Sequence, residues 1–287
     1  MAKLDNFTGL TKTQEDLLKK YYCFGSLGLL NLNVVNDAFT FHTRVAQRSE
    51  QGTRASAWLQ YKNDLLLLKA KKRNDKFSHY KLELTPTKVI NNLKAIFECK
   101  LAAGEGKNDA SVAVEYTHEK FKEKITYFTH QNAVRLQLTT GKPEIGFGLD
   151  AKVKIEGLQV ENLTPAFWWF KDGARLVLKH VGNDFKSFGS FEASFFQAIS
   201  GDTNFGSKVV TNWNSKATTI EVGGDYKYDA NTLVKSKINS AGNIGMALTK
   251  TLSDKLRVSV ATEYKAQSLL AHSSDGYKFG LRFDFTH

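Results

Sequence analysis

The sequence predicts an all-β fold of many strands, preceded by one short helix. Residues 277–286 alternate strictly between apolar and polar side chains, and a period of two is the period of a β-strand. Similar alternating stretches, separated by turn-forming residues, follow one another along most of the 287 residues. The chain contains only three prolines, as expected of a sheet that needs its backbone N–H donors for the ladder.

The alternation by itself leaves two arrangements open. A soluble sandwich would turn the apolar face of each strand toward a core, whereas a membrane barrel would turn it toward lipid and the polar face toward water. Apolar residues make up 41% of the chain, and no run approaches the roughly 18 apolar residues of a membrane-spanning helix. The aromatic content of 12% suits either arrangement.

The chain is basic, with 40 lysines and arginines against 29 aspartates and glutamates, for a net charge of +11. Such a charge is typical of nucleic-acid-binding surfaces, but the basic residues here are spread along the chain and often alternate with apolar ones, as in Lys152-Val153-Lys154-Ile155. A barrel lumen lined in this way would concentrate anions. We expect no nucleic acid as partner.

No catalytic or metal-binding constellation is found. The two cysteines, Cys23 and Cys99, form neither a disulfide framework nor a metal-ligand spacing, and the seven histidines are scattered. The N-terminus lacks the apolar core of a signal peptide, and its Asp5, Glu15 and Asp16 are unlike a transit peptide. We therefore expect no enzyme activity, no cofactor and no bound metal.

The first predicted element is an amphipathic helix over residues 11–22. Thr11-x-x-Gln14 has the form of a capping box, and Leu10, Leu17 and Leu18 lie at helical spacing. The helix is compatible with an ordinary surface position and with a position inside a pore. In either case the glycines that follow it allow a bend into the first strand.

The rest of the chain predicts strand after strand. The clearest are residues 39–45, 54–62, 93–101, 134–138, 145–155, 175–180, 256–265 and 277–286. Turn residues separate them at 73–75, 104–109, 141–143, 171–173, 182–184, 201–202, 223–225, 253–254 and 273–276. The apolar run 65–68 is compatible with a strand buried on both faces or with a helix fragment. The aromatic cluster 168–170 is compatible with a membrane-interface belt or with a binding patch.

Three stretches carry a resemblance to known proteins. Lys278, Gly280, Phe283 and Phe285 follow an order that resembles the sorting signal in the last strand of mitochondrial outer-membrane barrels. The stretch 229–252, with Ser236-Lys237-Ile238-Asn239 and Ile244-Gly245, is similar to the signature of the voltage-dependent anion channel family, the eukaryotic porins. Residues 19–25 also resemble the helix-to-strand junction of that family.

The resemblance implies a transmembrane β-barrel of about 19 strands in the mitochondrial outer membrane, with residues 1–24 as an N-terminal segment whose short amphipathic helix lies in the lumen and residues 25–287 as the barrel. At about 14 residues per strand and turn, the chain after the helix is long enough for that number. The implied function is a voltage-gated, anion-selective channel for small metabolites such as ATP, ADP and phosphate. The implied partners are membrane lipid, the anionic metabolites and nucleotides in transit, and a homo-oligomer or a larger mitochondrial assembly.

The resemblance also suggests site residues. Lys12, Lys19 and Lys20 are candidate anion contacts on the pore helix. Further candidate basic residues of the lumen are Lys94, Lys152, Lys154, Lys237, Arg257, Lys278 and Arg282. Two departures stand out: Asn92-Leu93-Lys94 replaces the Gly-Leu-Lys of the family, and residues 65–71 lack the membrane-facing glutamate that the family often has in its fourth strand.

Three other hypotheses remain open at this point. A diverged porin could be a structural accessory subunit of a larger mitochondrial membrane assembly, with a plugged lumen. A protein-import pore of the same superfamily would have a more acidic lumen than a charge of +11 suggests. A soluble basic β protein that binds nucleic acid would lack the lipid-facing surface altogether.

Overall fold

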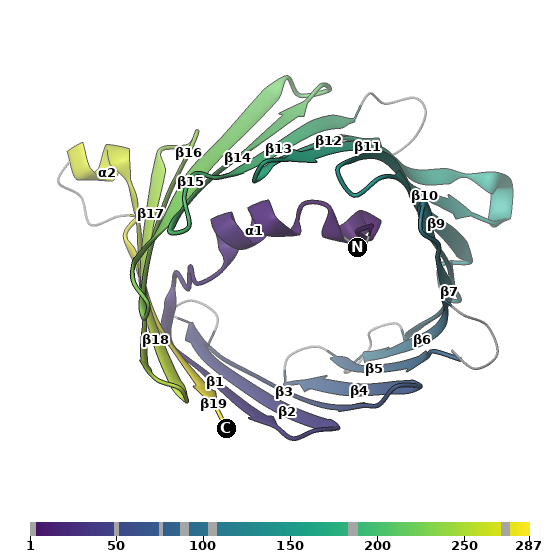
Figure 1. The fold of residues 1–287 in the computed structure, drawn as a ribbon, viewed down its shortest axis with the longest axis horizontal. Helices are drawn as coiled ribbons and strands as arrows, with labels where there is room; N and C mark the ends of the chain where they lie inside the picture. The colour runs from purple at the N-terminus through teal and green to yellow at the C-terminus, as the bar shows by residue number, and fades with distance from the viewer. Residues whose placement is uncertain are drawn as a thin grey trace.

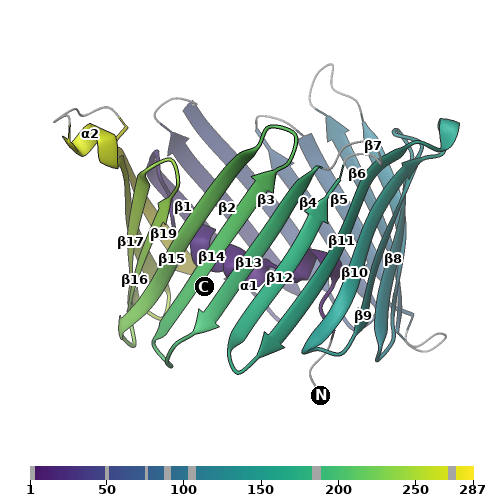
Figure 2. The ribbon, with the colours of Figure 1, turned by 90° about the horizontal axis from the view of Figure 1, so that it is seen from above.

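The described residues form one closed sheet of 19 strands, in which each strand pairs with its neighbours in the sequence and β1 pairs in parallel with β19 to close the ring (Figure 1). The computed structural model describes residues 4–48, 52–74, 77–86, 92–102, 108–182, 189–270 and 276–287. All other neighbouring strands are antiparallel, and the strands are tilted along the wall (Figure 2). The prediction of a barrel of about 19 strands is confirmed.

The strands follow the predicted alternating segments closely. Their bounds in the first half of the ring are β1 Ser26–Val35, β2 Phe39–Arg48, β3 Gly52–Lys62, β4 Leu66–Arg73, β5 Phe77–Leu84, β6 Leu93–Ala102, β7 Asp109–Thr117, β8 Phe121–Phe128, β9 Ala133–Gly141 and β10 Ile145–Lys154. The second half contains β11 Val160–Lys171, β12 Ala174–Val181, β13 Ser190–Ala198, β14 Thr203–Asn212, β15 Ala217–Asp229, β16 Thr232–Asn239, β17 Asn243–Ser253, β18 Leu256–Lys265 and β19 Lys278–Thr286.

The exposure of the strand residues is the reverse of that in a soluble sandwich. On β10 the apolar Ile145 and Phe147 are 46% and 63% exposed on the outside, whereas Asp150 on the inner face is 3% exposed. Large apolar side chains on many other strands, such as Leu30 and Met246, are exposed in the same way. An apolar belt on the outside of a closed sheet is the surface that lipid covers, and closure leaves no unpaired edge in the hydrocarbon. The soluble alternative is thereby excluded.

The helices are short: α1 Lys12–Lys19, α2 Ala266–Leu270 and the 3-10 turns η1 Phe7–Gly9 and η2 Glu156–Leu158. Among the described residues, none of them is long and apolar enough to cross a bilayer. Helix α1 lies inside the ring (Figures 1 and 2), as predicted. It is shorter than the predicted 11–22 because the chain turns at Tyr21, whose φ of 72° does not continue a helix.

The predicted capping box at Thr11 is wrong. The Thr11 hydroxyl donates to the Glu15 carboxylate at 3.1 Å rather than capping a backbone N–H, and the side-chain amide of Gln14 is buried without a hydrogen-bond partner in the described part of the chain. Gln14 faces the barrel wall together with the leucines of α1, so it cannot turn back to the N-cap. Packing against the wall therefore overrides the local capping pattern.

The ambiguous run 65–68 belongs to a strand. Residues from Leu66 onward form β4, and Leu68 is 45% exposed on the outer face, so the run is neither a helix fragment nor buried on both sides. Of the predicted turns, 73–75, 104–109, 182–184 and 273–276 lie partly or mostly outside the described residues. Residues 223–225, predicted as a turn, instead form part of β15.

Candidate functional site

The candidate functional site is the lumen of the barrel, and α1 is the largest element inside it. Its apolar side packs against the inner faces of β13, β14 and β15, with Leu17 and Leu18 buried. Two glycines of the wall make room for these leucines: a Cβ on Gly206 would lie 2.6 Å from Leu17 Cδ2, and one on Gly223 would lie 3.0 Å from Leu18 Cδ2. The helix is thus recessed against one wall and does not lie across the centre (Figure 1).

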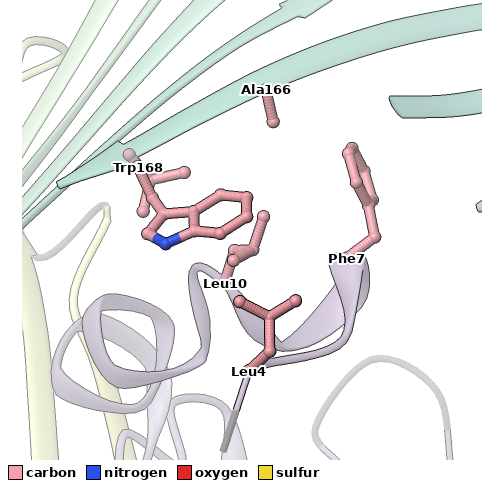
Figure 3. Packing of buried hydrophobic residues seen from close by; sticks show 6 residues of the cluster. Leu4, Phe7, Leu10, Ala166 and Trp168 are labelled. Atoms are coloured by element: carbon pink, nitrogen blue, oxygen red, sulfur yellow. The ribbon is translucent and has the colours of Figure 1, made fainter. Parts of the chain in front are cut away.

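The residues before α1 are held by a small apolar cluster on the inner wall (Figure 3). Leu4, Phe7 and Leu10 form this cluster with Ala166 and Trp168 of β11 and Val177 of β12, and Trp168 is 1% exposed. Successive strand residues point to opposite faces, so Trp168 points inward while Trp169 is 38% exposed on the outside. The prediction of an aromatic belt at 168–170 is therefore wrong for Trp168, which anchors the N-terminal segment.

The C-terminal end of α1 is capped by lysines from the opposite end of the chain. Lys235 Nζ donates to the carbonyl oxygens of Asp16 at 2.9 Å and Lys20 at 3.1 Å. Lys237 Nζ donates to the carbonyl oxygen of Leu18 at 2.9 Å. The last carbonyl groups of a helix lack hydrogen-bond donors within the helix and carry partial negative charge. The two ammonium groups from β16 supply these carbonyls with both donors and positive charge.

The link between α1 and β1 is also tied to the wall. The Arg257 guanidinium donates to the Tyr21 hydroxyl at 2.8 Å, and the Arg282 guanidinium lies 5.6 Å from the centre of the Tyr21 ring. Gly280 provides the space in which the Cys23 backbone passes β19. Burial raises the pKa of the Cys23 thiol above its usual range, so the thiol stays protonated near neutral pH.

The predicted basic residues of the lumen all lie on the inner face, and most of them pair with acids. Lys94 lies 3.7 Å from Glu83, and Lys152 and Lys154 share Glu161 at 2.6 and 3.0 Å. The other pairs among the predicted residues are Lys237 with Glu221, Lys278 with Glu263 and Arg282 with Asp284. Their roles in binding anions stay predictions.

The three predicted lysines of the pore helix are exposed to the lumen. Lys19 Nζ lies 3.3 Å from the Glu15 carboxylate one turn away, and Lys20 Nζ lies 5.2 Å from the centre of the Tyr21 ring. Partial burial of Glu15 acts to raise its pKa, but Lys19 and the Thr11 hydroxyl outweigh it and hold the pKa below its usual value. Glu15 is therefore charged at neutral pH, and it offsets part of the positive charge of the helix.

Several polar residues of the lumen were not singled out from the sequence. Arg175 and Lys179 of β12 donate to Thr13 and Thr11 at 3.2 and 3.1 Å, and Arg135 binds Asp150 with two nitrogens. The alternation of β12 places its two basic residues on one face, so this signal was present. Which partner each would meet depends on strand register and on the path of the N-terminal segment.

The predicted sorting residues occupy both faces of β19. Lys278 and Gly280 point inward, whereas Phe283 and Phe285 lie on the outer face. No group of three or more His, Cys, Asp or Glu side chains stands close enough to hold a metal ion in the described ranges.

Comparison with known proteins agrees with this architecture. A family model described as eukaryotic porin matches residues 5–280. The chain is 24% identical over 279 residues to mitochondrial outer membrane protein porin 2 of Arabidopsis thaliana, a match that covers 96% of this chain and 97% of the relative. It is 21% identical over 278 residues to the voltage-dependent anion-selective channel of Drosophila melanogaster, with 96% of each covered.

Solved structures with the same architecture include bacterial porins. Two variants of Rh. blastica porin superpose with TM-scores of 0.55 and 0.56 at 10% and 11% identity, and each match covers 86% of this chain and 98% of the other. At such identity the likeness shows the fold alone.

Proposed function

This chain belongs to the eukaryotic porin family, and from that premise we propose that it is a voltage-gated, anion-selective channel for small metabolites such as ATP, ADP and phosphate. The family and the closed barrel establish the coarser statement: the chain is a channel that passes small solutes across the mitochondrial outer membrane. Anion selectivity and voltage gating are the finer part of the proposal. We further propose residues 1–24 as the gating segment and residues 25–287 as the conducting wall.

The observation that carries anion selectivity is the excess of basic residues on the inner face. Lysines and arginines line the lumen on most strands, and the acids that pair with them are fewer, in keeping with a net charge of +11. Surface fields are screened over about 8–10 Å at physiological salt, a distance comparable to the radius of a large barrel. The charges of the wall therefore act on an ion anywhere in the lumen, without a tight site for each ion.

The candidate anion contacts on α1 support the same proposal. Lys12, the first residue of α1, and Lys20, which directly follows α1, are exposed in the lumen, whereas Leu17 and Leu18 are buried against the wall. Helix α1 is held to the wall by its apolar side and a few polar contacts, and because it carries charge a membrane potential can bias its position. The name of the Drosophila relative supports voltage dependence by family likeness.

The test is the reversal potential of the refolded protein in a planar bilayer under a potassium chloride gradient. We expect a modest preference for chloride, and a smaller preference in the double variant Lys12→Glu/Lys20→Glu. The matched control is Lys216→Glu/Lys255→Glu, which changes the same charge in exposed turns outside the lumen. Cation preference in the wild type would overturn anion selectivity, and a conductance that does not fall at high potential of either sign would overturn gating.

The accessory-subunit hypothesis makes a different prediction for the same recording. It predicts no conductance from the isolated barrel and co-purification with a larger membrane assembly. Stable channels from the pure protein would remove it. Assembly into homo-oligomers stays a proposal, to be checked by cross-linking in the membrane.

A further inference from the structure

The inner wall opposite α1 carries a basic pocket. Four cationic side chains line it, namely Arg44 of β2, Arg54 of β3, and Lys71 and Arg73 of β4, around a volume of about 250 Å³. The small residues Ala46, Ala55 and Ser56 also line it, and no acid is among the lining residues in the part of the chain that the structure describes. We refer to it as the β2–β4 pocket; these strands lie across the ring from α1 (Figure 1).

Strand register shows that this pocket opens into the lumen. Arg44 stands opposite Asn31 of β1, and the Asn31 amide donates to Asp284 of β19. Asp284 binds Arg282, whose guanidinium lies against the Tyr21 ring of the N-terminal segment inside the barrel. Arg44, Ser56 and Arg73 form one row across β2, β3 and β4, and residues two apart on a strand share a face. All four cationic residues therefore face the water of the lumen.

The charge of this wall differs from that of the wall farther round the ring. On β5 to β15 many basic residues of the inner face pair with an acid of the same or a neighbouring strand, as Lys81 does with Glu83 at 2.5 Å and Lys208 with Glu192 at 3.0 Å. The described inner-facing residues of β2, β3 and β4 include no aspartate or glutamate. Among the described residues, the inner faces of these three strands therefore carry basic but no acidic side chains, on the side of the lumen that α1 leaves open.

Neighbouring side chains support the pocket. Trp58 lies one row from Arg44 and Arg73; it stacks on His42 with ring centres 5.1 Å apart and carries Lys69 Nζ 4.5 Å above its ring. Arg44, Arg54 and Arg73 each have an interaction partner within the protein. A guanidinium has five N–H donors, so it can hold a partner within the protein and a phosphate oxygen at the same time.

We propose that the β2–β4 pocket is a discrete binding site for the phosphate groups of a soluble polyphosphate anion in transit through the lumen. The inference rests on the proposed anion channel. In addition to the general electrostatic attraction of the wall, it gives the channel one localised binding site. Arginine binds phosphate through two parallel N–H donors, which a single lysine ammonium or a chloride ion cannot reproduce. Three arginines and one lysine around one pocket match the several negative charges of a linked di- or triphosphate.

The probe is inorganic triphosphate, added to single channels of the refolded full chain in potassium chloride. We expect brief interruptions of the current, whose mean duration reports how long the anion stays bound. The double variant Arg44→Lys/Arg73→Lys keeps the charge but removes two forks. It should leave the chloride reversal potential unchanged and shorten the interruptions about tenfold, the effect of losing one charge-assisted hydrogen bond or more.

A second comparison separates the pocket from the general field. Arg44→Gln/Arg73→Gln and the control Lys94→Gln/Lys124→Gln each remove two positive charges from the inner wall. Both should reduce the chloride preference, but only the first should shorten the interruptions. Circular dichroism of each refolded variant confirms the barrel before recording, and the lysine variant keeps the test decisive if the glutamine variant does not fold.

The outcomes distinguish the inference from the proposed function. Equal shortening by the pocket and control pairs, or no effect of the lysine variant, would overturn the discrete site while anion selectivity stands. A wild type that prefers potassium to chloride yet shows triphosphate interruptions sensitive to the lysine variant would overturn the selectivity and leave the binding site in place.

Discussion

Gly280 of the last strand lies against the backbone carbonyl of Cys23, with no room for a side chain between them. The same glycine belongs to the pattern that resembles the sorting signal. One residue type at one position thus meets two demands, since the absent side chain both fits the pattern and allows the N-terminal segment to pass along the wall.

A methyl group at Gly280 should therefore weaken the barrel. Because a Cβ there would clash with the backbone of Cys23, we expect Gly280→Ala to destabilise the refolded protein by about 1–3 kcal/mol, the usual cost of overpacking. Thermal unfolding in detergent, followed by circular dichroism, should show the melting temperature lowered by several degrees. Gly28→Ala is the matched control, because a Cβ on Gly28 meets nothing within 4 Å. Equal melting temperatures for the two variants would contradict the contact.

Loss of Lys235 should loosen the C-terminal end of α1. Lys235→Gln removes the ammonium that binds the Asp16 and Lys20 carbonyls, and hydrogen bonds to a charged group contribute about 1.5–3 kcal/mol each. The natural reporter is Cys23, which is buried close to this end of the segment. In a Cys99→Ser background, a water-soluble maleimide should modify Cys23 faster in Lys235→Gln than in Lys255→Gln, a turn variant. Identical rates would mean that α1 is held by its apolar side alone.

The pH at which Cys23 becomes reactive should be higher than that of an ordinary cysteine. The thiolate is the reactive form, and burial raises the pKa of Cys23, so less thiolate is present at any given pH than in a free cysteine. In the Cys99→Ser chain the rate of maleimide modification should still rise steeply above about pH 8.5, where an ordinary thiol begins to level off. The same chain unfolded in dodecyl sulfate supplies the reference curve. A folded-state midpoint at or below the reference would show that the thiol is not desolvated.

Trp168 should be essential for the order of the N-terminal segment. It is the largest fully buried side chain among the described residues, and Trp168→Ala should cost about 3–5 kcal/mol because it leaves a cavity under Leu4 and Leu10. The control Trp213→Ala removes a side chain that is 58% exposed, and it should change stability far less. Limited proteolysis should cleave near residues 4–10 faster in Trp168→Ala. Protection equal to that of wild type would contradict the anchoring role.

The strands of the barrel wall could be predicted from the sequence because their side chains alternate. The contacts inside the lumen were harder to predict because they depend on long-range packing. Residues 145–155 show why, because one apolar face and one charged face predict a strand. The terminal pattern and the family signature then predict that the apolar face contacts lipid. Trp168 was misjudged because the aromatic run was treated as one patch, although strand alternation separates Trp168 from Trp169.

The position of α1 on the barrel wall could not be predicted from local sequence patterns. Gly206 and Gly223 look like ordinary strand glycines until Leu17 and Leu18 are placed against them. Likewise Lys235 reads as one lumen lysine among many, and its bonds to α1 join residues more than two hundred positions apart. Such contacts follow from the path of the N-terminal segment across the ring, which no stretch of sequence encodes by itself.

The parallel pairing of β1 with β19 also governs how the molecule can be assembled. No hairpin can bring these two strands together, because a hairpin joins only antiparallel neighbours. Until residues from Arg282 onward reach Leu29 and its successors, the first and last completed strands both expose backbone donors and acceptors that hydrocarbon does not tolerate. The unfinished barrel therefore needs a polar or protein-lined environment for its two open edges until β1 and β19 pair. Only the closed barrel can then be surrounded entirely by lipid.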